Sequence, residues 1–266
     1  MKKKIMKRSQ NAKHVRPFYK GTAFKSRAAK LAKEDKRFVH WVCPPGADCY
    51  PVEEASFTEN VYWRIFRIIA EFIEGFEFLS KLQKEVTIFG SARTGQNHKY
   101  YKQAVKLGRL CGKAGYSVIT GGGPGIMEAG NKGAYLEGGE SVGLDIELPS
   151  EQRRNEYVTR AIGFHYFFTR KVMLSASAQA YVFFPGGFGT MDEAFEMLTL
   201  VQTGKIPKTV PCIFVGKEHW QPFIDWVKDH LLKNKYIAKK DLDLIRLVDT
   251  PEEAFAIIQK TTERQL

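Results

Sequence analysis

Short apolar runs alternate with longer amphipathic stretches over most of the chain. The apolar runs are four to six residues long and predict β-strands over residues 86–89, 116–119, 141–146, 180–184, 211–215 and 245–248. The stretches between them predict helices over residues 100–114, 126–137, 168–177, 191–203, 220–232 and 251–259. Strands that alternate with helices are typical of a parallel sheet covered on both faces. We therefore expect an α/β fold with a doubly wound parallel sheet.

Two helix starts carry further signals. The last predicted helix opens with Thr250, then Pro251, and Glu253 three residues after the threonine, which is the pattern of a capping box. An additional helix is predicted over residues 59–82, ahead of the first strand. It is dense in aromatic residues: Tyr62, Trp63, Phe66, Phe72, Phe76 and Phe78. We expect this helix to pack on the main domain or at a subunit interface.

The net positive charge of the chain comes from its first 40 residues. The 266 residues carry a formal net charge of +12. Residues 1–40 hold 14 of the 41 Lys and Arg but only 2 of the 29 Asp and Glu, so the remainder is neutral overall. We expect a basic, flexible extension over residues 1–50 and a folded domain over residues 51–266. Nucleic-acid binding is not expected of the folded body, whereas a tether to nucleic acid or an acidic membrane stays open for the extension.

Several classes of protein are excluded or disfavoured by composition. No run of 18 or more apolar residues occurs, so a membrane span is excluded. The extension lacks the apolar core of a secretory signal, and four cysteines are too few for a disulfide scaffold. We expect a reduced, cytoplasmic protein. His40, Cys43 and Cys49 match no common zinc spacing, so no metal is predicted.

Two strand ends lead directly into glycine-rich turns that open helices. Residues 119–128 read ITGGGPGIME, and residues 184–193 read FPGGFGTMDE. Glycines let the backbone approach a ligand, and the helix behind each turn presents free N–H groups. Neither turn has the lysine of a Walker loop or the spacing of a dinucleotide fingerprint. Asp145 follows the first glycine turn at a sequence separation that suggests a carboxylate for a ribose. In a dinucleotide-binding unit, however, such a turn follows the first strand, whereas this turn follows the second, which disfavours NAD chemistry. The pair predicts a phosphorylated ligand between the turns.

Charged residues near the second turn have both a structural and a chemical interpretation. Thr190 and Glu193 match a capping box, which would give the glutamate no chemical role. The alternative is that Asp192 or Glu193 faces the sugar of a phosphorylated ligand or a developing cation. Arg170 and Lys171 open an otherwise apolar helix, where they are either a solvated helix end or a planar fork for phosphate and ring stacking.

These residues together resemble a known family. Residues 185–193, PGGFGTMDE, match the P-G-G-x-G-T-x-x-E motif of LONELY GUY-type (LOG) proteins. Arg170 and Lys171 match the R-K motif that precedes it, and residues 121–128 look like the first loop of the family. The resemblance covers about residues 86–258. It implies a Rossmann-like fold and a nucleoside 5′-monophosphate phosphoribohydrolase, which cleaves AMP or cytokinin riboside monophosphates to free base and ribose 5-phosphate.

The resemblance also implies roles for individual residues. It makes Arg170 and Glu193 the catalytic pair and requires no metal and no cofactor. The implied phosphate contacts are Gly186, Gly187, Gly189, Thr190, Ser91, Gly121, Gly122 and Gly123. The residues expected near the base and ribose are Glu128, Lys171, Met173 and Asp192. Glu128 stands where the family has a glycine, which leaves its role open.

Partners and competing functions follow from the same resemblance. It implies a nucleotide substrate and a homodimer, and the longer members of the family include higher oligomers such as hexamers. Although family members bear the label of a lysine decarboxylase, no pyridoxal-phosphate lysine context is visible in this sequence. The alternative function is a nucleotide-binding or sensing protein without turnover, which would not need Arg170 and Glu193 together. Base preference is not predicted.

Overall fold

The structure is a computed structural model that describes residues 60–147, 154–176 and 178–264. The chain divides into two units, Met1–Arg64 and Ile65–Leu266, and the second holds every described strand. The basic extension over residues 1–50 and the candidate ligands His40, Cys43 and Cys49 lie outside the described residues. The predicted division at residue 50 therefore stays a prediction. Among the described helices, none combines the length and the apolar character needed to cross a membrane.

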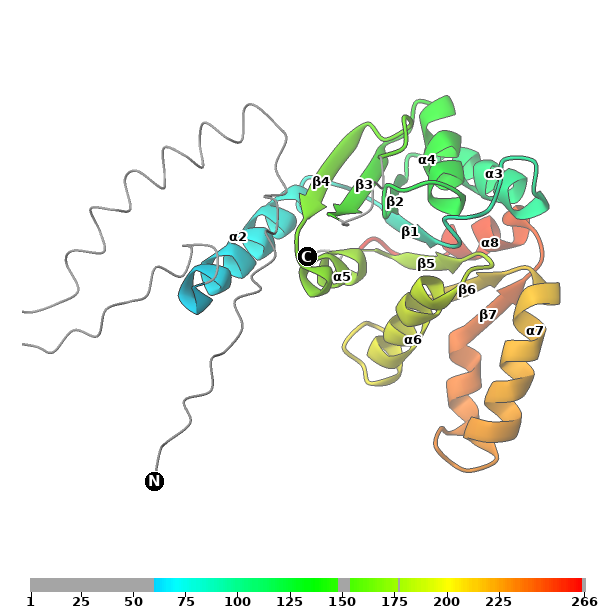
Figure 1. Ribbon diagram of the computed structural model, residues 1–266. Coiled ribbons are helices and arrows are strands. Elements are labelled where there is room, and N and C mark those ends of the chain that lie inside the picture. The colour runs from blue at the N-terminus through cyan, green and yellow to red at the C-terminus, as the bar shows by residue number, and fades with distance from the viewer. Residues whose placement is uncertain (1–59, 148–153, 177, 265–266) are drawn as a thin grey trace, which may run out of the picture. The chain divides into compact units, whose positions relative to one another are not determined.

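Seven strands form one parallel sheet in the described part of the chain, with the order β4-β3-β2-β1-β5-β6-β7 (Figure 1). The chain builds the sheet outward from β1 to β4 and then returns to place β5 on the other side of β1. The direction of winding thus reverses between β1 and β5, which is where ligands bind in open parallel sheets. The strands are β1 Glu85–Phe89, β2 Ser117–Thr120, β3 Ser141–Ile146, β4 Arg160–Phe164, β5 Ala180–Phe183, β6 Cys212–Val215 and β7 Ile245–Val248.

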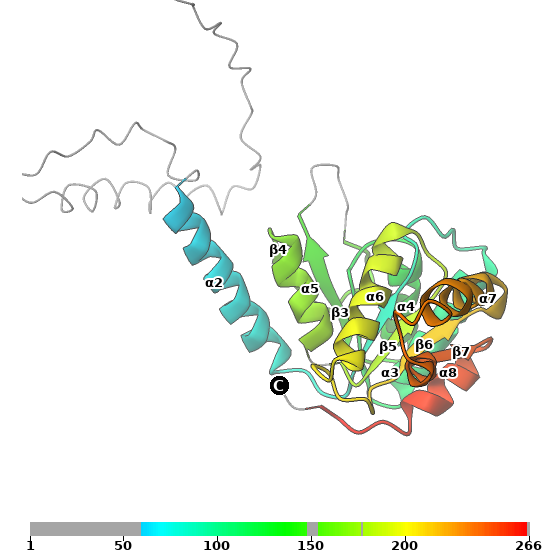
Figure 2. The same cartoon turned by 90° about the horizontal axis from the view of Figure 1, so that it is seen from below.

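Helices cover both faces of this sheet (Figures 1 and 2). They are α3 Lys99–Lys113, α4 Ile126–Leu136, α5 Phe167–Ala176, α6 Phe188–Gln202, α7 Lys217–Trp226 and α8 Pro251–Ile258. A further helix, α2 Val61–Leu79, precedes β1 and contacts α5. A π-helical segment, Val227–Leu232, extends α7, and a 3-10 helix, Lys239–Leu244, precedes β7. The predicted doubly wound α/β fold is confirmed.

Two hydrophobic cores lie on the two faces of the sheet because neighbouring strand residues point to opposite sides. On β5, Tyr181 and Phe183 belong to the core that includes side chains of α5, α6 and α7. Val182, between them, belongs to the core formed with α3, α4 and α8. All four residues of β5 are buried, so this strand reads as a continuous apolar run rather than as an alternating one.

Most predicted elements are found within a few residues of their expected bounds. The capping box of α8 is confirmed, because Thr250 Oγ1 accepts from the Glu253 backbone N–H at 3.2 Å and the Glu253 carboxylate accepts from the Thr250 N–H at 3.3 Å. One strand, β4, was not predicted. It lies at the edge of the sheet, contains Gly163 and is mostly half-buried, so it lacks the apolar run that marks the central strands.

Candidate active site

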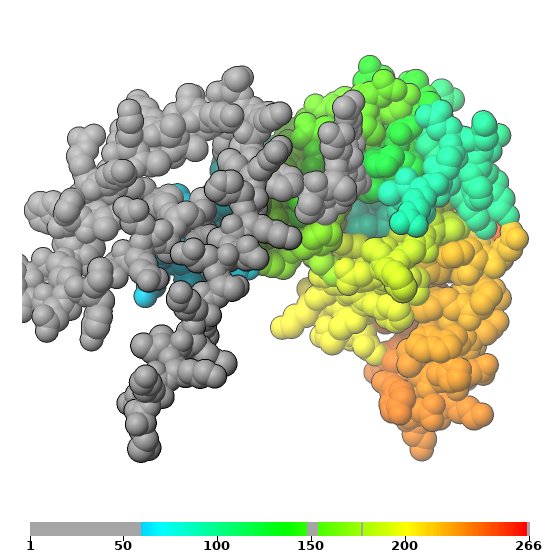
Figure 3. All heavy atoms as spheres, in the orientation of Figure 1, coloured from blue at the N-terminus to red at the C-terminus, as the bar shows by residue number. Residues whose placement is uncertain are grey.

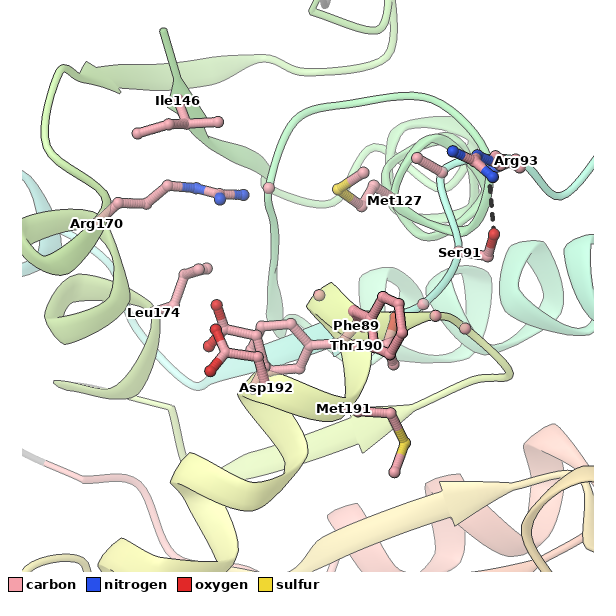
Figure 4. A pocket seen from close by; sticks show the side chains of 18 of the residues that line it. Phe89, Ser91, Arg93, Met127, Ile146, Arg170, Leu174, Thr190, Met191 and Asp192 are labelled. Atoms are coloured by element: carbon pink, nitrogen blue, oxygen red, sulfur yellow. Dashed lines mark hydrogen bonds between the residues drawn. The ribbon is translucent and has the colours of Figure 1, made fainter. Parts of the chain in front are cut away.

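Three loops meet at the carboxyl ends of adjacent strands and line one cavity of about 860 Å³. They follow β1, β2 and β5, which lie side by side in the sheet. The space-filling view presents the molecule in the same orientation as the ribbon (Figure 3), and Figure 4 shows the lining from close by. The loops contribute residues 90–93, Gly121 and residues 186–189 to the lining. The reversal of winding thus coincides with a cavity.

Close backbone packing joins these loops. Ser91 donates its N–H to the Pro185 carbonyl at 3.1 Å and accepts from the Ile126 N–H at 3.0 Å, so the loop after β1 is bonded to the other two. Gly125, the residue before α4, has a φ of +72°, and a Cβ there would lie 2.3 Å from the Ser91 carbonyl oxygen. Only glycine satisfies both conditions, which explains one glycine of the first turn structurally.

The second glycine turn leads into the N-terminus of α6. The N-cap residue is Gly187, and no side chain caps the helix. The first helical hydrogen bond runs from the Met191 N–H to the Gly187 carbonyl, so the N–H groups of residues 188–190 have no partner within the helix. An added Cβ would meet nothing within 4 Å at Gly187 or Gly189. This open helix end, with its partial positive charge, suits an anion.

The interpretation of Thr190 and Glu193 as a capping box is wrong. The helix α6 begins at Phe188, three residues before its predicted start, so Thr190 lies inside the first turn. The Thr190 hydroxyl lies beside Gly186, where a Cβ would come within 2.0 Å of Oγ1. Glu193 consequently sits in the second turn, too far along the helix to close a capping box. The early start arises because Gly187 itself serves as the N-cap.

Glu193 is a buried carboxylate on the lining of the cavity. Its side chain is 7% exposed, and Oε2 has no hydrogen-bond partner. Burial raises the pKa of Glu193 to about 7, and the Glu196 and Asp192 carboxylates act in the same direction, while Lys171 and Arg170 oppose the rise. A carboxyl group near neutrality in a cavity is suited to acid–base chemistry.

Arg170 extends from α5 across the cavity (Figure 4). Its Nε donates to the Leu144 carbonyl at 2.7 Å. Burial lowers the pKa of Arg170, whereas the charges of Glu193 and Asp145 act in the opposite direction. The guanidinium also lies against the first glycine turn, because a Cβ added to Gly121 would lie 2.1 Å from Arg170 Nη2. Because Gly121 has no side chain, the Arg170 guanidinium can occupy this position.

Asp192 and Lys171 are paired with each other. Lys171 Nζ lies 2.7 Å from Asp192 Oδ2 and 3.0 Å from Glu196 Oε2. Burial works to lower the pKa of Lys171, but the hydrogen bonds to Asp192 and Glu196, together with the charges of Glu193 and Glu196, outweigh it, and the pKa is raised. Asp192 lines the cavity, while Lys171 does not. The ion pair offsets the negative charge of Asp192, one of the two carboxylates, with Glu193, that would repel a bound anion.

The remaining predicted residues divide between the cavity and its surroundings. Gly122, Gly123, Glu128 and Met173 are not part of the lining. Met173 is fully buried in the hydrophobic core, and Glu128 accepts hydrogen bonds from the Tyr101 hydroxyl at 2.6 Å and from the Gln96 amide at 2.9 Å. The cavity brings together the other predicted residues: Arg170, Glu193, Gly186, Gly187, Gly189, Thr190, Ser91, Gly121 and Asp192.

Several lining residues carry no sequence signal that we recognised. Apolar side chains from four elements line the cavity: Phe89, Met127, Ile146, Phe167 and Leu174. Periodicity marks such residues as core, and only the tertiary arrangement distinguishes a cavity wall from a packed interior. Arg93, exposed in the loop after β1, also lines the cavity. Residues 90–93, which follow the first strand, are an expected place for a ligand contact, and Arg93 is one of them.

Asp145 and Asn155 stabilise the surroundings of the first turn. Asn155 donates its side-chain amide to the Gly122 and Gly123 carbonyls at 3.0 and 3.1 Å. Asp145 pairs with Arg154 at 2.5 Å, and its Oδ1 is buried without a partner. Asp145 is not part of the cavity lining, although its charge acts on Arg170. Among the described residues, no three His, Cys, Asp or Glu side chains are grouped so that they could hold a metal ion.

Comparison with known proteins finds a matching family model and similar curated proteins. A family model described as "Possible lysine decarboxylase" matches residues 127–258. The cytokinin riboside 5′-monophosphate phosphoribohydrolase of Rhodococcoides fascians is 27% identical over 180 residues, which cover 66% of this chain and 89% of that protein. The cytokinin riboside 5′-monophosphate phosphoribohydrolase LOG of Oryza sativa subsp. japonica is 28% identical over 189 residues, which cover 69% of this chain and 74% of that protein.

A solved structure is similar at a lower level. The molybdenum cofactor carrier protein of Chlamydomonas reinhardtii is 20% identical, with a TM-score of 0.49. The match covers 67% of this chain and 97% of that one.

Proposed function

This chain belongs to the LONELY GUY-type (LOG) family, and from that premise we propose that it is a nucleoside 5′-monophosphate phosphoribohydrolase. The reaction is hydrolysis of the N-glycosidic bond of AMP or a cytokinin riboside monophosphate to free base and ribose 5-phosphate. The proposal depends on one observation above all. The buried carboxylate of Glu193 and the guanidinium of Arg170 line the same cavity as the uncapped N-terminus of α6.

The 5′-phosphate binds in the second glycine turn. The N–H groups of residues 188–190 are its donors, and the bare Cα atoms of Gly187 and Gly189 let it approach the backbone. Ser91 and Gly121 line the same cavity and complete the phosphate end. The apolar side chains of Ile146, Phe167 and Leu174 give the base a surface on which to lie. Anchoring at the phosphate supplies binding energy that orients the glycosidic bond.

Glu193 stabilises the charge that develops on the ribose. Cleavage of the glycosidic bond builds positive charge on the sugar ring, as in glycoside hydrolysis. An ionised carboxylate beside the anomeric carbon lowers the energy of that state and positions or deprotonates the attacking water. Because Oε2 of Glu193 has no partner in the protein, this oxygen is available to the ribose or to the water.

Arg170 acts on the leaving base. The base departs with the electron pair of the glycosidic bond, and the guanidinium orients it and offsets its charge. Arginine is a poor proton donor, and Asp192 is engaged by Lys171, so we assign the proton on the base to water. Neither a metal ion nor a cofactor takes part in this sequence of steps.

The function is tested by product analysis with substrates that differ only in their phosphate. Purified protein is incubated with AMP, with adenosine and with other nucleoside monophosphates, and free base is measured by chromatography. We expect base release from AMP and little from adenosine, because adenosine lacks the group held by α6. Binding of nucleotides without base release would contradict the proposal and favour the alternative of a nucleotide sensor.

We further propose that the chain forms a homodimer or larger homo-oligomer through α2. Ile65, Ile69, Ile73 and Phe76 recur at helical spacing and are 42–62% exposed, which is more apolar surface than a solvated helix normally presents.

We also propose a cytoplasmic location. The buried free thiols of Cys111 and Cys212 agree with a reducing compartment.

The Ile69→Glu variant is expected to have a lower mass than the wild type in size-exclusion chromatography with light scattering. A charge in the middle of the apolar stripe would be buried without a partner in the assembly. Glu74→Ala, a change at an exposed position of the same helix, is the control and should leave the mass unchanged. A monomeric wild type would contradict the proposal.

A further inference from the structure

Glu71, on α2, contacts the beginning of the helix that carries Arg170. Its Oε1 accepts from the His165 backbone N–H at 2.8 Å, and its Oε2 accepts from the Tyr166 N–H at 3.3 Å and lies 2.5 Å from the Thr169 hydroxyl. The contacts join positions 94 to 98 residues apart in the sequence. Both carboxylate oxygens are therefore used at one place, the N-terminus of α5.

We propose that Glu71 is a positioning residue for Arg170. The inference rests on the proposed function, in which Arg170 acts on the leaving base, and adds a residue outside the cavity lining on which that role depends. The helix α5 begins at Phe167, so Glu71 bonds the two residues before it and one side chain of its first turn. A carboxylate at this place satisfies free N–H groups and interacts favourably with the helix dipole.

The path from Glu71 to the guanidinium is short. Thr169, which contacts Glu71, is fully buried and directly precedes Arg170 in the chain. The Arg170 N–H donates to the Tyr166 carbonyl at 3.3 Å, which is the first backbone hydrogen bond of α5. Tyr166 is also bonded to Glu71. The backbone of Arg170 is thus fixed by a turn that Glu71 holds from outside.

The side chain of Arg170 has its own support at the other end. Nε donates to the Leu144 carbonyl of β3 at 2.7 Å. The arginine is therefore held at two points, the first turn of α5 and the end of β3. Removal of Glu71 takes away the outside support of the first point, because the Arg170–Tyr166 backbone bond then lacks the bonds from Glu71 to Tyr166 and Thr169, whereas the bond to Leu144 is unaffected. A displacement of Arg170 affects a transition-state contact more than ground-state binding.

Close packing between α2 and α5 keeps the carboxylate in place. A Cβ added to Gly75, one turn after Glu71, would lie 2.6 Å from Met173 Sδ and 3.3 Å from the Phe164 ring. The two helices therefore approach each other at Gly75 without an intervening side chain. This contact fixes the distance at which Glu71 reaches α5, and it gives Met173 a structural role.

The test compares Glu71→Ala and Glu71→Gln with Glu74→Ala as the matched control. Glu74 is an exposed carboxylate on the same helix. We expect Glu71→Ala to lower kcat about tenfold with KM for the nucleotide changed less than about twofold. Glu71→Gln, which keeps an acceptor for the α5 donors, should recover most of the rate, and Glu74→Ala should leave it unchanged. Equal rates in the Glu71→Ala and Glu74→Ala variants would overturn the proposal.

A double variant shows whether Glu71 acts through Arg170. In an Arg170→Ala background, the further change Glu71→Ala should cost no additional rate, because the group that it positions is already absent. A loss as large as in the wild-type background would overturn the proposal. If the wild type releases no base from any nucleotide, the proposed function fails, and backbone hydrogen exchange at residues 167–170 decides instead. Faster exchange in Glu71→Ala than in Glu74→Ala supports positioning, and equal exchange overturns it.

Discussion

The Glu193→Gln variant is expected to lose about 10²-fold or more in kcat. At a pH above 7, the same variant should also unfold at a higher temperature than the wild type. Glutamine has the size of the glutamate but cannot carry the negative charge that stabilises the ribose cation. The proposed catalytic role and the cost of burying the charge have the same origin, which is the desolvation of Glu193 in the cavity wall. Steady-state kinetics and thermal unfolding at several pH values measure both effects.

The sign of the stability effect follows from the direction of the pKa shift. The pKa of Glu193 is about 7 in the folded protein and 4.5 in the unfolded chain, so the folded state binds the proton more tightly. Stability of the wild type therefore falls as the pH rises from about 4.5 to about 7. Above pH 7, the buried charge of Glu193 lowers the free energy of unfolding by about 3 kcal/mol at most, because each pKa unit corresponds to about 1.36 kcal/mol. The variant should gain this amount at pH 8 and nothing at pH 4.

Glu85→Gln is the matched control for this prediction. Glu85 is 3% exposed, burial raises its pKa to about 7, and its Oε2 also lacks a partner. It begins β1, at the opposite end of that strand from the cavity. Glu85→Gln should be stabilised above neutral pH in the same way but keep its turnover. Near-normal turnover of Glu193→Gln would contradict the catalytic role of Glu193.

The pH dependence of the wild type gives a second measurement of the same group. If Glu193 acts as a carboxylate, kcat should rise as the pH increases through about 7, because the proton leaves the group in that range. The Glu85→Gln variant should reproduce this profile. A wild-type kcat that falls over the same range would indicate that the protonated form acts instead.

The Gly121→Ala variant is expected to lose about 10²-fold in kcat with little loss of stability. The added Cβ would lie 2.1 Å from Arg170 Nη2 and 2.9 Å from Met127 Sδ. Both atoms are at the far ends of flexible side chains, which can move away. The fold is therefore retained, while the guanidinium is displaced from the position in which it meets the leaving base. Kinetics with AMP and the midpoint of thermal unfolding measure the two quantities.

Gly95→Ala is the control for the glycine substitution. Gly95 lies in the exposed loop between β1 and α3, and a Cβ there would meet nothing within 4 Å. This variant should keep both turnover and stability. Turnover of Gly121→Ala equal to that of Gly95→Ala would show that the position of Arg170 against the glycine turn is irrelevant to the reaction.

Local patterns in the sequence were sufficient to predict the fold class, and they also predicted which residues form the candidate site. Six of the strands are apolar runs bounded by turn residues. Such local patterns do not depend on the order of the strands in the sheet, so they can be recognised from the sequence. The glycine turns and the residues Arg170 and Glu193 are visible because the loops that bind ligands in such sheets follow strand ends. The edge strand β4 was missed because partial burial leaves it without an apolar run.

The packing of distant segments sets which residues share the cavity and what holds them there, and local sequence patterns do not predict it. Met173 and Glu128 stand close in sequence to predicted site residues, but one is buried in the core and the other is bonded to Tyr101. The start of α6 at Phe188 turned Glu193 from a capping residue into a member of the cavity wall. Glu71 reaches the helix of Arg170 across more than 90 residues. No local pattern records such contacts, because burial and hydrogen bonding between distant segments arise only when the elements pack.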